Sequence, residues 1–145
     1  MARFSVSGLS TVAPTTVRAA ASVFAVASRS LWIKEIGVFN TTATAAYVAL
    51  CRFTNATGVG AGLTEVADNE EASAVVGTGF AGHTADGAVG ANFRYGALPA
   101  AIGGGVIWTF DGNGIRVAPG TANGVGIICP SGTGQIVTYH ICWEE

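Results

Sequence analysis

The chain has 145 residues, which is enough for one domain with its own hydrophobic core and leaves little room for a second. Half of the residues are hydrophobic and only 11% are charged, with a formal net charge of −2 and seven scattered basic residues, which argues against nucleic-acid binding. No stretch reaches the roughly 18 consecutive apolar residues of a membrane helix, which argues against a helical membrane protein.

The low charge content is the most unusual property of the composition, because about 25% is typical of soluble domains. The seven basic and nine acidic side chains would be spread over about 6,900 Å² in a monomer of this mass, or about one per 430 Å². We therefore expect much of the surface to be covered by copies of the chain or by a partner.

The residue types favour strands and turns over helices. Valine (16) and isoleucine (9) far outnumber leucine (5), and there are 21 glycines and 15 threonines. Branched residues and threonine favour strands, and glycine favours tight turns. The composition predicts an all-β fold, as a single domain over residues 1–145.

Residues 1–30 form an N-terminal segment that could be an arm or an edge strand. Residues 3–7 alternate and predict a short strand, whereas residues 16–26 mix alanines that allow a helix with valines that favour a strand. The apolar run 19–27 could mimic a secretory signal, although its polar lead-in is unusual for one.

Two strands with apolar residues on both faces follow, at residues 31–39 and 47–53. In the first, strict alternation groups Trp32, Lys34, Ile36 and Val38 on one face and Leu31, Ile33, Glu35 and Phe39 on the other. Such double-sided strands suggest that both faces are covered, which again favours self-association.

The middle of the chain is rich in glycine and predicts mostly loops, with a short strand at 63–67 and an acidic run at 68–71. Residues 77–92 read as loop. Phe93, Tyr95 and Ala97 then alternate with polar residues or glycine, which predicts a half-buried strand that Pro99 ends.

Turn signals are clearest in the last third. The sequence Asp-Gly-Asn-Gly at 111–114 lies between apolar runs at 106–110 and 115–118 and predicts a β-hairpin. Residues 125–129 and 135–143 predict two more strands, the last with Val137, Tyr139, Ile141 and Trp143 on one face. The spacing of strands and turns predicts one antiparallel β-sandwich of about eight strands, similar to a jelly roll.

Motifs that carry chemistry are scarce. Residues 77–82 match G-x-G-x-x-G, but no helix can open after them, so a flexible loop is the better interpretation. His83 with Asp86 could suggest a hydrolytic site, yet a solvated loop histidine is the favoured interpretation. The cysteines 51, 129 and 142 lack metal-ligand spacing, and Cys51 and Cys142 lie in apolar strands as reduced thiols, which fits cytoplasmic synthesis. The sequence predicts no catalytic, cofactor-binding or metal-binding residue, and no enzyme.

Three residues are candidates for an interface. Trp32 shares its predicted face with Lys34, which suggests partial exposure, whereas Trp108 and Trp143 lie on apolar faces and are expected in the core. His140 lies on the polar face of the last strand and could make a pH-sensitive subunit contact.

The segments GGGVIWTFDGNGIRVAPGTANGVGIICPSGTGQIVTYHICWEE (103–145), KEIGVFNTTATAAYVALCRFT (34–54) and GFAGHTAD (79–86) resemble small virion proteins of tailed bacteriophages. The resemblance implies a jelly-roll decoration, or cement, protein that binds the outside of the phage head as a trimer and stabilises contacts between major capsid subunits. It carries over no functional residue, and it implies synthesis in the host cytoplasm followed by a location on the virion.

Three other interpretations remain open. The first alternative is a receptor- or carbohydrate-binding jelly roll of a tail fibre or baseplate, which would need exposed aromatic residues such as Trp32 and Tyr47. The others are a small hydrolase centred on His83 and a secreted trimer similar to tumour necrosis factor or to lectins, which would need the N-terminal segment to be cleaved.

Overall fold

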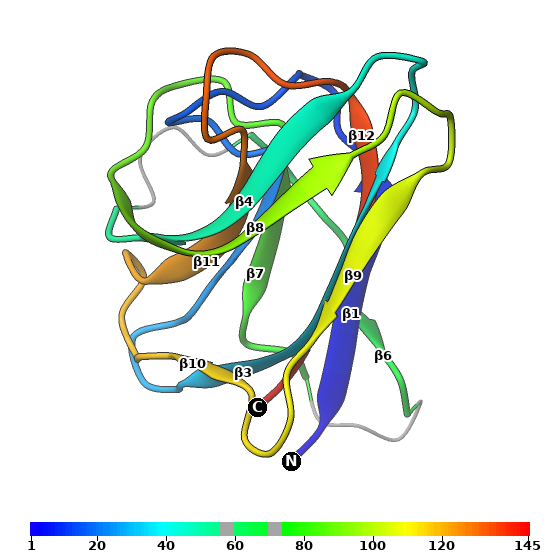
Figure 1. Ribbon diagram of the computed structural model, residues 1–145. Helices are drawn as coiled ribbons and strands as arrows, with labels where there is room; N and C mark the ends of the chain where they lie inside the picture. Colours follow the sequence, from blue (N-terminus) through cyan, green and yellow to red (C-terminus); the bar gives the residue numbers. More distant parts are fainter. Residues whose placement is uncertain (56–59, 70–73) are drawn as a thin grey trace.

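The computed structural model describes residues 1–55, 60–69 and 74–145. These residues form twelve β-strands, and none of them is helical (Figure 1). The strands are β1 (Arg3–Leu9), β2 (Ala21–Phe24), β3 (Leu31–Asn40), β4 (Ala46–Phe53), β5 (Ala61–Gly62), β6 (Val66–Ala67), β7 (Thr78–Ala81), β8 (Val89–Leu98), β9 (Gly105–Thr109), β10 (Ile115–Val117), β11 (Gly124–Ile128) and β12 (Val137–Glu144). The all-β prediction is confirmed. The structure has more strands than the eight or so predicted, because the short strands β5 and β7 form in segments that read as loop. The two-residue β6 lies within the short strand predicted at 63–67.

The strands form two antiparallel sheets that pack face to face. The first sheet has the order β10-β3-β12-β1-β6, and β9 also pairs with β3. The second sheet has the order β5-β7-β2-β11-β4-β8. All strand pairs are antiparallel, so the predicted antiparallel β-sandwich is confirmed. No helix in the described ranges could span a membrane.

The two strands around the Asp-Gly-Asn-Gly sequence do not form the predicted hairpin. β9 and β10 both pair antiparallel with β3, at Ile107↔Gly37 and Ile115↔Ile33, so they run in the same direction along one edge of the sheet. The turn signal itself is correct, because Gly112 and Gly114 have φ of +61° and +73°. The loop therefore connects two consecutive parts of one interrupted edge strand. The residues of the turn alone do not determine whether the chain reverses direction after it.

The N-terminal segment lies inside both sheets and is not an arm. β1 lies between β12 and β6 in the first sheet, and β2 lies between β11 and β7 in the second. The ambiguous alanine-rich segment is a central strand, with Ala21, Val23 and Phe24 all buried.

An extra residue in β3 changes which side chains share a face. Opposite β12, Glu35 pairs with Cys142 and Ile33 pairs with Trp143, which leaves Lys34 without a partner in the ladder. This bulge interrupts the alternation, so Ile36 and Val38 lie on the same buried face as Leu31 and Ile33 and not on the face of Trp32 as predicted. β3 therefore has one fully buried face, and its other face, with Trp32 and Phe39, is only partly buried.

A second bulge, in β8, also changes which side chains share a face. Leu50 pairs with Arg94 and Cys51 with Asn92, so Phe93 is the extra residue. Phe93 packs against the core, whereas Tyr95 is 65% exposed on the outer face, contrary to the prediction that they share one face.

The main core fills the space between the sheets, and a smaller cluster lies on the outer face of the second sheet. In β4, Val48 and Leu50 belong to the main core, while Ala49, Cys51 and Phe53 belong to the outer cluster. The segments around residues 17–20 and 82–87 cover this cluster and are joined by backbone hydrogen bonds. From Ala49 to Phe53, the second apolar face of β4 is thus covered by the chain itself, whereas Tyr47 on the same face is 62% exposed.

Candidate interaction surfaces

The three predicted interface residues, Trp32, Lys34 and His140, all lie on the outer face of the first sheet. Trp32 and Lys34 come from β3 on either side of the buried Ile33, and His140 comes from the neighbouring β12. All three side chains are partly exposed. The fold therefore brings the three candidate residues onto one surface.

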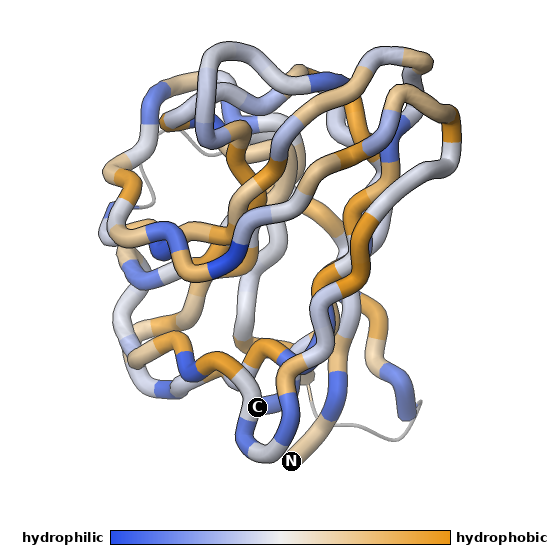
Figure 2. Tube along the Cα trace, in the orientation of Figure 1, coloured by the Kyte–Doolittle hydropathy of each residue, from blue (hydrophilic) through white to orange (hydrophobic). Residues whose placement is uncertain are grey.

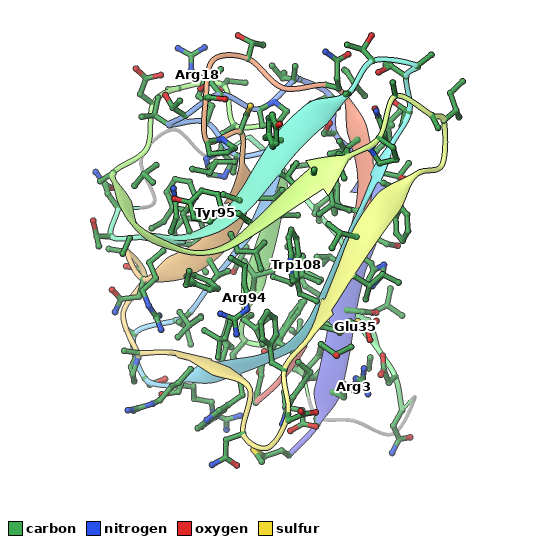
Figure 3. All side chains as sticks on the ribbon, viewed as in Figure 1. Arg3, Arg18, Glu35, Arg94, Tyr95 and Trp108 are labelled. Atoms are coloured by element: carbon green, nitrogen blue, oxygen red, sulfur yellow. The ribbon has the colours of Figure 1, made fainter. Side chains whose placement is uncertain are left out.

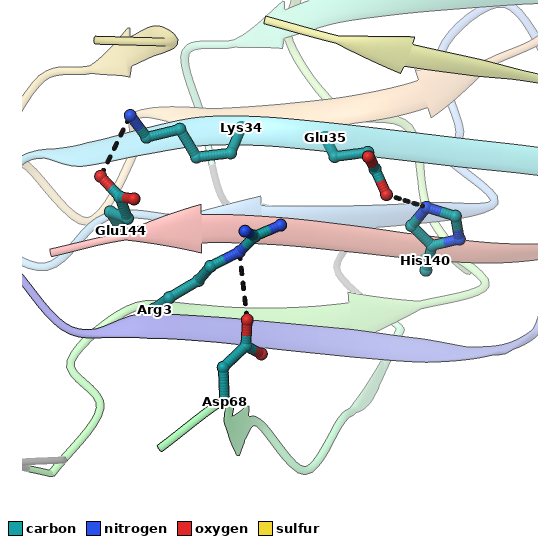
Figure 4. A network of polar contacts seen from close by, with 6 residues as sticks. All are labelled: Arg3, Lys34, Glu35, Asp68, His140 and Glu144. Atoms are coloured by element: carbon teal, nitrogen blue, oxygen red, sulfur yellow. Dashed lines mark hydrogen bonds and ion pairs between the residues drawn. The ribbon is translucent and has the colours of Figure 1, made fainter. Parts of the chain in front are cut away.

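The charged residues on this face are paired with one another (Figure 4). Lys34 Nζ lies 3.0 Å from Glu144 Oε2 and donates to the carbonyl of Gly112 at 2.8 Å. His140 Nε2 lies 3.0 Å from Glu35 Oε1, and Arg3 Nε lies 3.1 Å from Asp68 Oδ2. Because each of these side chains already has a partner, Lys34 and His140 offer few free hydrogen-bonding groups to another molecule.

Trp32 borders an open pocket at the end of the sandwich where the two chain termini meet. The pocket has a volume of about 460 Å³ and is lined by Met1, Ser28, Arg29, Ser30, Trp32 and Glu145. The Glu145 carboxylate accepts hydrogen bonds from Trp143 Nε1 at 2.9 Å and from the backbone of Gly77 at 2.7 Å. An aromatic ring beside an arginine and serine hydroxyls can hold a small polar ligand.

A second surface lies where β8 of one sheet approaches β9 and β10 of the other, at the open side of the sandwich. The side chain of Trp108 fills the gap between the strands (Figure 3), and a Cβ on Gly96 would lie 2.8 Å from it. Arg52 stacks 5.9 Å from the ring centroid of Phe93, and Arg94 stacks 5.7 Å from that of Phe110. Aromatic rings with arginines over them therefore close this side of the core.

Three arginines gather here, and no described acidic residue pairs with them. We call Arg52, Arg94 and Arg116 the arginine flank. Arg52 Nη1 donates to the carbonyl of Arg116 at 3.0 Å, and Arg116 Nε donates to Ser30 Oγ at 3.1 Å. Among the described residues, no carboxylate lies within ion-pair distance of any of the three, whereas Arg3, Arg18 and Lys34 each have one.

Sequence reasoning missed the arginine flank. The three residues are 22 or more positions apart in the chain and come from β4, β8 and β10, so they form no basic cluster in the sequence. No local pattern could have found them, because only the pairing of the sheet edges brings them together.

His83 is buried, contrary to the prediction of a solvated loop histidine. It is 1% exposed, its Nε2 lies 2.7 Å from Ser22 Oγ, and its ring packs between Phe24 and Phe53 at centroid distances of 6.4 and 5.3 Å. Burial lowers the pKa of His83 to about 4, so the ring is neutral at pH 7.

The residues that a hydrolytic site at His83 would need are not assembled around it. Its Nδ1 has no hydrogen-bond partner in the described part of the chain. Asp86, the expected orienting acid, instead accepts from Arg18 Nε at 2.7 Å. The Ser22–His83 pair therefore forms a buried polar contact within the outer cluster.

The glycine motif at 77–82 forms strand β7 and the turn after it, not the flexible loop that the sequence suggests. A Cβ on Gly79 would lie 2.8 Å from Val6 Cγ1, and Gly82 has φ of +53°. These glycines allow close packing of the sheets and a tight turn. No group of three or more potential metal ligands occurs within residues 1–55, 60–69 and 74–145.

Comparison of the chain with models of protein families, with curated proteins and with solved structures found no match.

Proposed function

We propose that this chain is a capsid decoration protein of a tailed bacteriophage, which binds the head exterior as a trimer and stabilises contacts between major capsid subunits. The role is mechanical, with no catalytic turnover, no cofactor and no contact with nucleic acid. The chain is synthesised in the host cytoplasm and resides on the virion surface.

We also propose that the sandwich is a jelly roll. Early strands pair with late strands in nested order, β1 with β12, β2 with β11, β3 with β9 and β10, and β4 with β8. Rolling up one long antiparallel hairpin in this way produces the two Greek keys of a jelly roll, which is common in viral capsid domains. Strands β5, β6 and β7 then form an insertion that extends the far edges of both sheets.

The observation that carries the functional proposal is the thinly charged exterior. Sixteen charged side chains are spread over 6447 Å², roughly one per 400 Å², which is sparse for a soluble monomer. Tyr47, Tyr95, Ile102 and Ile107 are 52–76% exposed, and Figure 2 traces hydrophobic and neutral residues along most of the chain. A surface of this kind favours burial against neighbours.

Cryo-electron microscopy of purified virions of the phage that encodes the chain tests this proposal. Density for the sandwich on the outside of the head, at junctions between major capsid subunits, is the expected result. Heads with full occupancy of the major capsid protein and no such density would refute it.

A second candidate function is receptor or carbohydrate binding in a tail fibre or baseplate. The Trp32 pocket and the exposed rings of Tyr47 and Tyr95 favour it, because aromatic faces stack on sugars. Titration of the protein with host surface polysaccharide, followed by tryptophan fluorescence, separates the two. Carbohydrate binding at this pocket requires a saturable change in tryptophan fluorescence. The change should be absent in Trp32→Ala and present in Trp108→Phe.

A further inference from the structure

The two flanks of the sandwich differ in how their outer strands are protected. On one flank the outer strands β5 and β6 have two residues each, so the edge that either strand itself offers to another strand is short. On the other flank β8 has ten residues and, within the part of the chain that the structure describes, pairs only with β4, while β9 and β10 pair only with β3. The flank formed by β8, β9 and β10 is therefore the long open edge of both sheets, a surface that proteins usually cover.

The arginine flank lies along this open edge and is prepared for carboxylates. Each guanidinium has five N–H donors, and the contacts of Arg52 and Arg94 within the chain use few of them. Stacking on Phe93 and Phe110 restricts both side chains, so that binding costs little further conformational entropy. Arginine with aromatic residues is also the composition that dominates interface hot spots.

Charge determines which surface of a second copy can bind there. A two-fold contact of the flank with itself would bring three unpaired arginines against three more, which is unfavourable. The chain has a formal net charge of −2, so the part outside these three arginines carries −5. The opposite flank is weakly acidic. Residues 60–69 contain Glu65 and Asp68 and no basic residue, although Asp68 pairs with Arg3 of the neighbouring β1 at 3.1 Å and Glu65 accepts a hydrogen bond from the backbone of Gly79 at 2.8 Å. Val66 between the two acidic residues is 59% exposed.

We propose that the arginine flank of one copy binds the β5–β6 flank of the next copy, head to tail. The two surfaces lie at opposite edges of the same sheets, and repetition of such a heterologous contact closes into a ring when the rotation fits. This inference rests on the proposed trimer and assigns its interface. The carboxylate oxygens of Glu65 and Asp68 that Gly79 and Arg3 leave free meet Arg52 and Arg94, and Val66 packs beside the rings of Phe93 and Phe110.

Size-exclusion chromatography with light scattering at low salt and micromolar concentration tests the contact. The wild type should have three times the 14.6 kDa mass of one chain, and added salt should dissociate it. The variants Arg52→Glu/Arg94→Glu and Val66→Arg should each have the mass of one chain. The matched control Arg18→Glu, which removes an exposed arginine paired with Asp86, should remain trimeric.

Mixing the two monomeric variants gives the sharpest result. Arg52→Glu/Arg94→Glu retains the acidic flank and Val66→Arg retains the arginine flank, so one intact interface can form between them. We expect particles of two chains in the mixture and only single chains in each variant alone, with circular dichroism confirming that both are folded. A self-complementary interface would leave the mixture monomeric.

The outcomes separate this inference from the proposed function. Trimeric Arg52→Glu/Arg94→Glu, or a mixture without pairs, overturns the inference and leaves the capsid role standing. A monomeric wild type overturns both the inference and the trimer. The capsid role itself is refuted only by absence of the chain from virions.

Discussion

The imidazole of His140 lies directly over the backbone of Gly37 on the outer face of the first sheet. The two residues are paired across β12 and β3, and a Cβ on residue 37 would contact Cε1 and lie 2.7 Å from Nδ1 of the ring. The missing side chain therefore leaves room for the ring over residue 37. There its Nε2 lies 3.0 Å from Glu35 Oε1, and its centroid lies 6.2 Å from that of the Phe39 ring.

Gly37→Ala should displace His140 and destabilise the sandwich. We expect a loss of about 1 kcal/mol in the free energy of unfolding, because the His140 ring must turn away from residue 37 and give up its contacts with Glu35 and Phe39. Urea unfolding followed by tryptophan fluorescence measures it. Gly62→Ala is the matched control, since a Cβ there meets nothing within 4 Å. Equal stability of the two variants would contradict the packing described here.

The buried Ser22–His83 pair should make stability depend on pH. The pKa of His83 is about 4 in the folded protein and 6.5 as its ordinary value, so between these values the unfolded chain binds more protons. The stability that neutral His83 contributes to the folded protein is fully present above pH 6.5 and is lost as the pH falls toward 4. The total change in the free energy of unfolding is roughly 3 kcal/mol.

Unfolding measured from pH 7.5 to 4 in the wild type and in Ser22→Ala/His83→Phe tests this dependence. The double variant keeps an aromatic ring against Phe53 and removes both polar atoms, so it should lose less stability over this range. Identical pH profiles for the two proteins would show that His83 is solvated in the folded state.

The cysteines should differ in reactivity toward thiol reagents. Burial raises the pKa of the Cys51 thiol to about 12, and its Sγ contacts the carbonyl of Gly126 at 3.7 Å. Burial also raises the pKa of Cys142, although a hydrogen bond from Arg3 opposes this and the side chain is partly exposed. Because the thiolate is the reactive form, Cys51 should react only on unfolding.

Mass spectrometry of the protein after timed alkylation at pH 8 measures these rates. Cys142 is expected to be modified before Cys51, and addition of urea should equalise the three sites. Rapid modification of Cys51 in the folded protein would contradict its burial.

Two tryptophans on adjacent strands should respond differently to truncation. Trp143 is fully buried, packs on Phe4 at a centroid distance of 6.1 Å and donates to Glu145, so Trp143→Ala should cost about 3–5 kcal/mol. Trp32→Ala removes a ring that borders an open pocket and should cost much less. Thermal unfolding of both variants measures the difference, and a larger loss for Trp32→Ala would contradict the assignment of Trp143 to the core.

Local patterns in the sequence were enough to predict the fold class. Alternation in residues 137–143 identifies a strand with one buried face, and the structure buries Val137, Tyr139, Ile141 and Trp143. Glycines at 112 and 114 identify a turn with positive φ. These properties follow from side-chain period and backbone sterics within a few residues, so they can be read before any partner strand is known.

Only the tertiary structure decided which strand pairs with which and where alternation breaks. The bulge at Lys34, the alignment of β9 and β10 along β3, the burial of His83 and the gathering of Arg52, Arg94 and Arg116 all depend on residues distant in the chain. Each is selected by the packing of one sheet on the other. The packing energy depends on pairs of contacting surfaces and not on any single segment. Local sequence was therefore enough to determine an antiparallel sandwich, whereas the residues that share each outer surface were decided by how the sheets assemble.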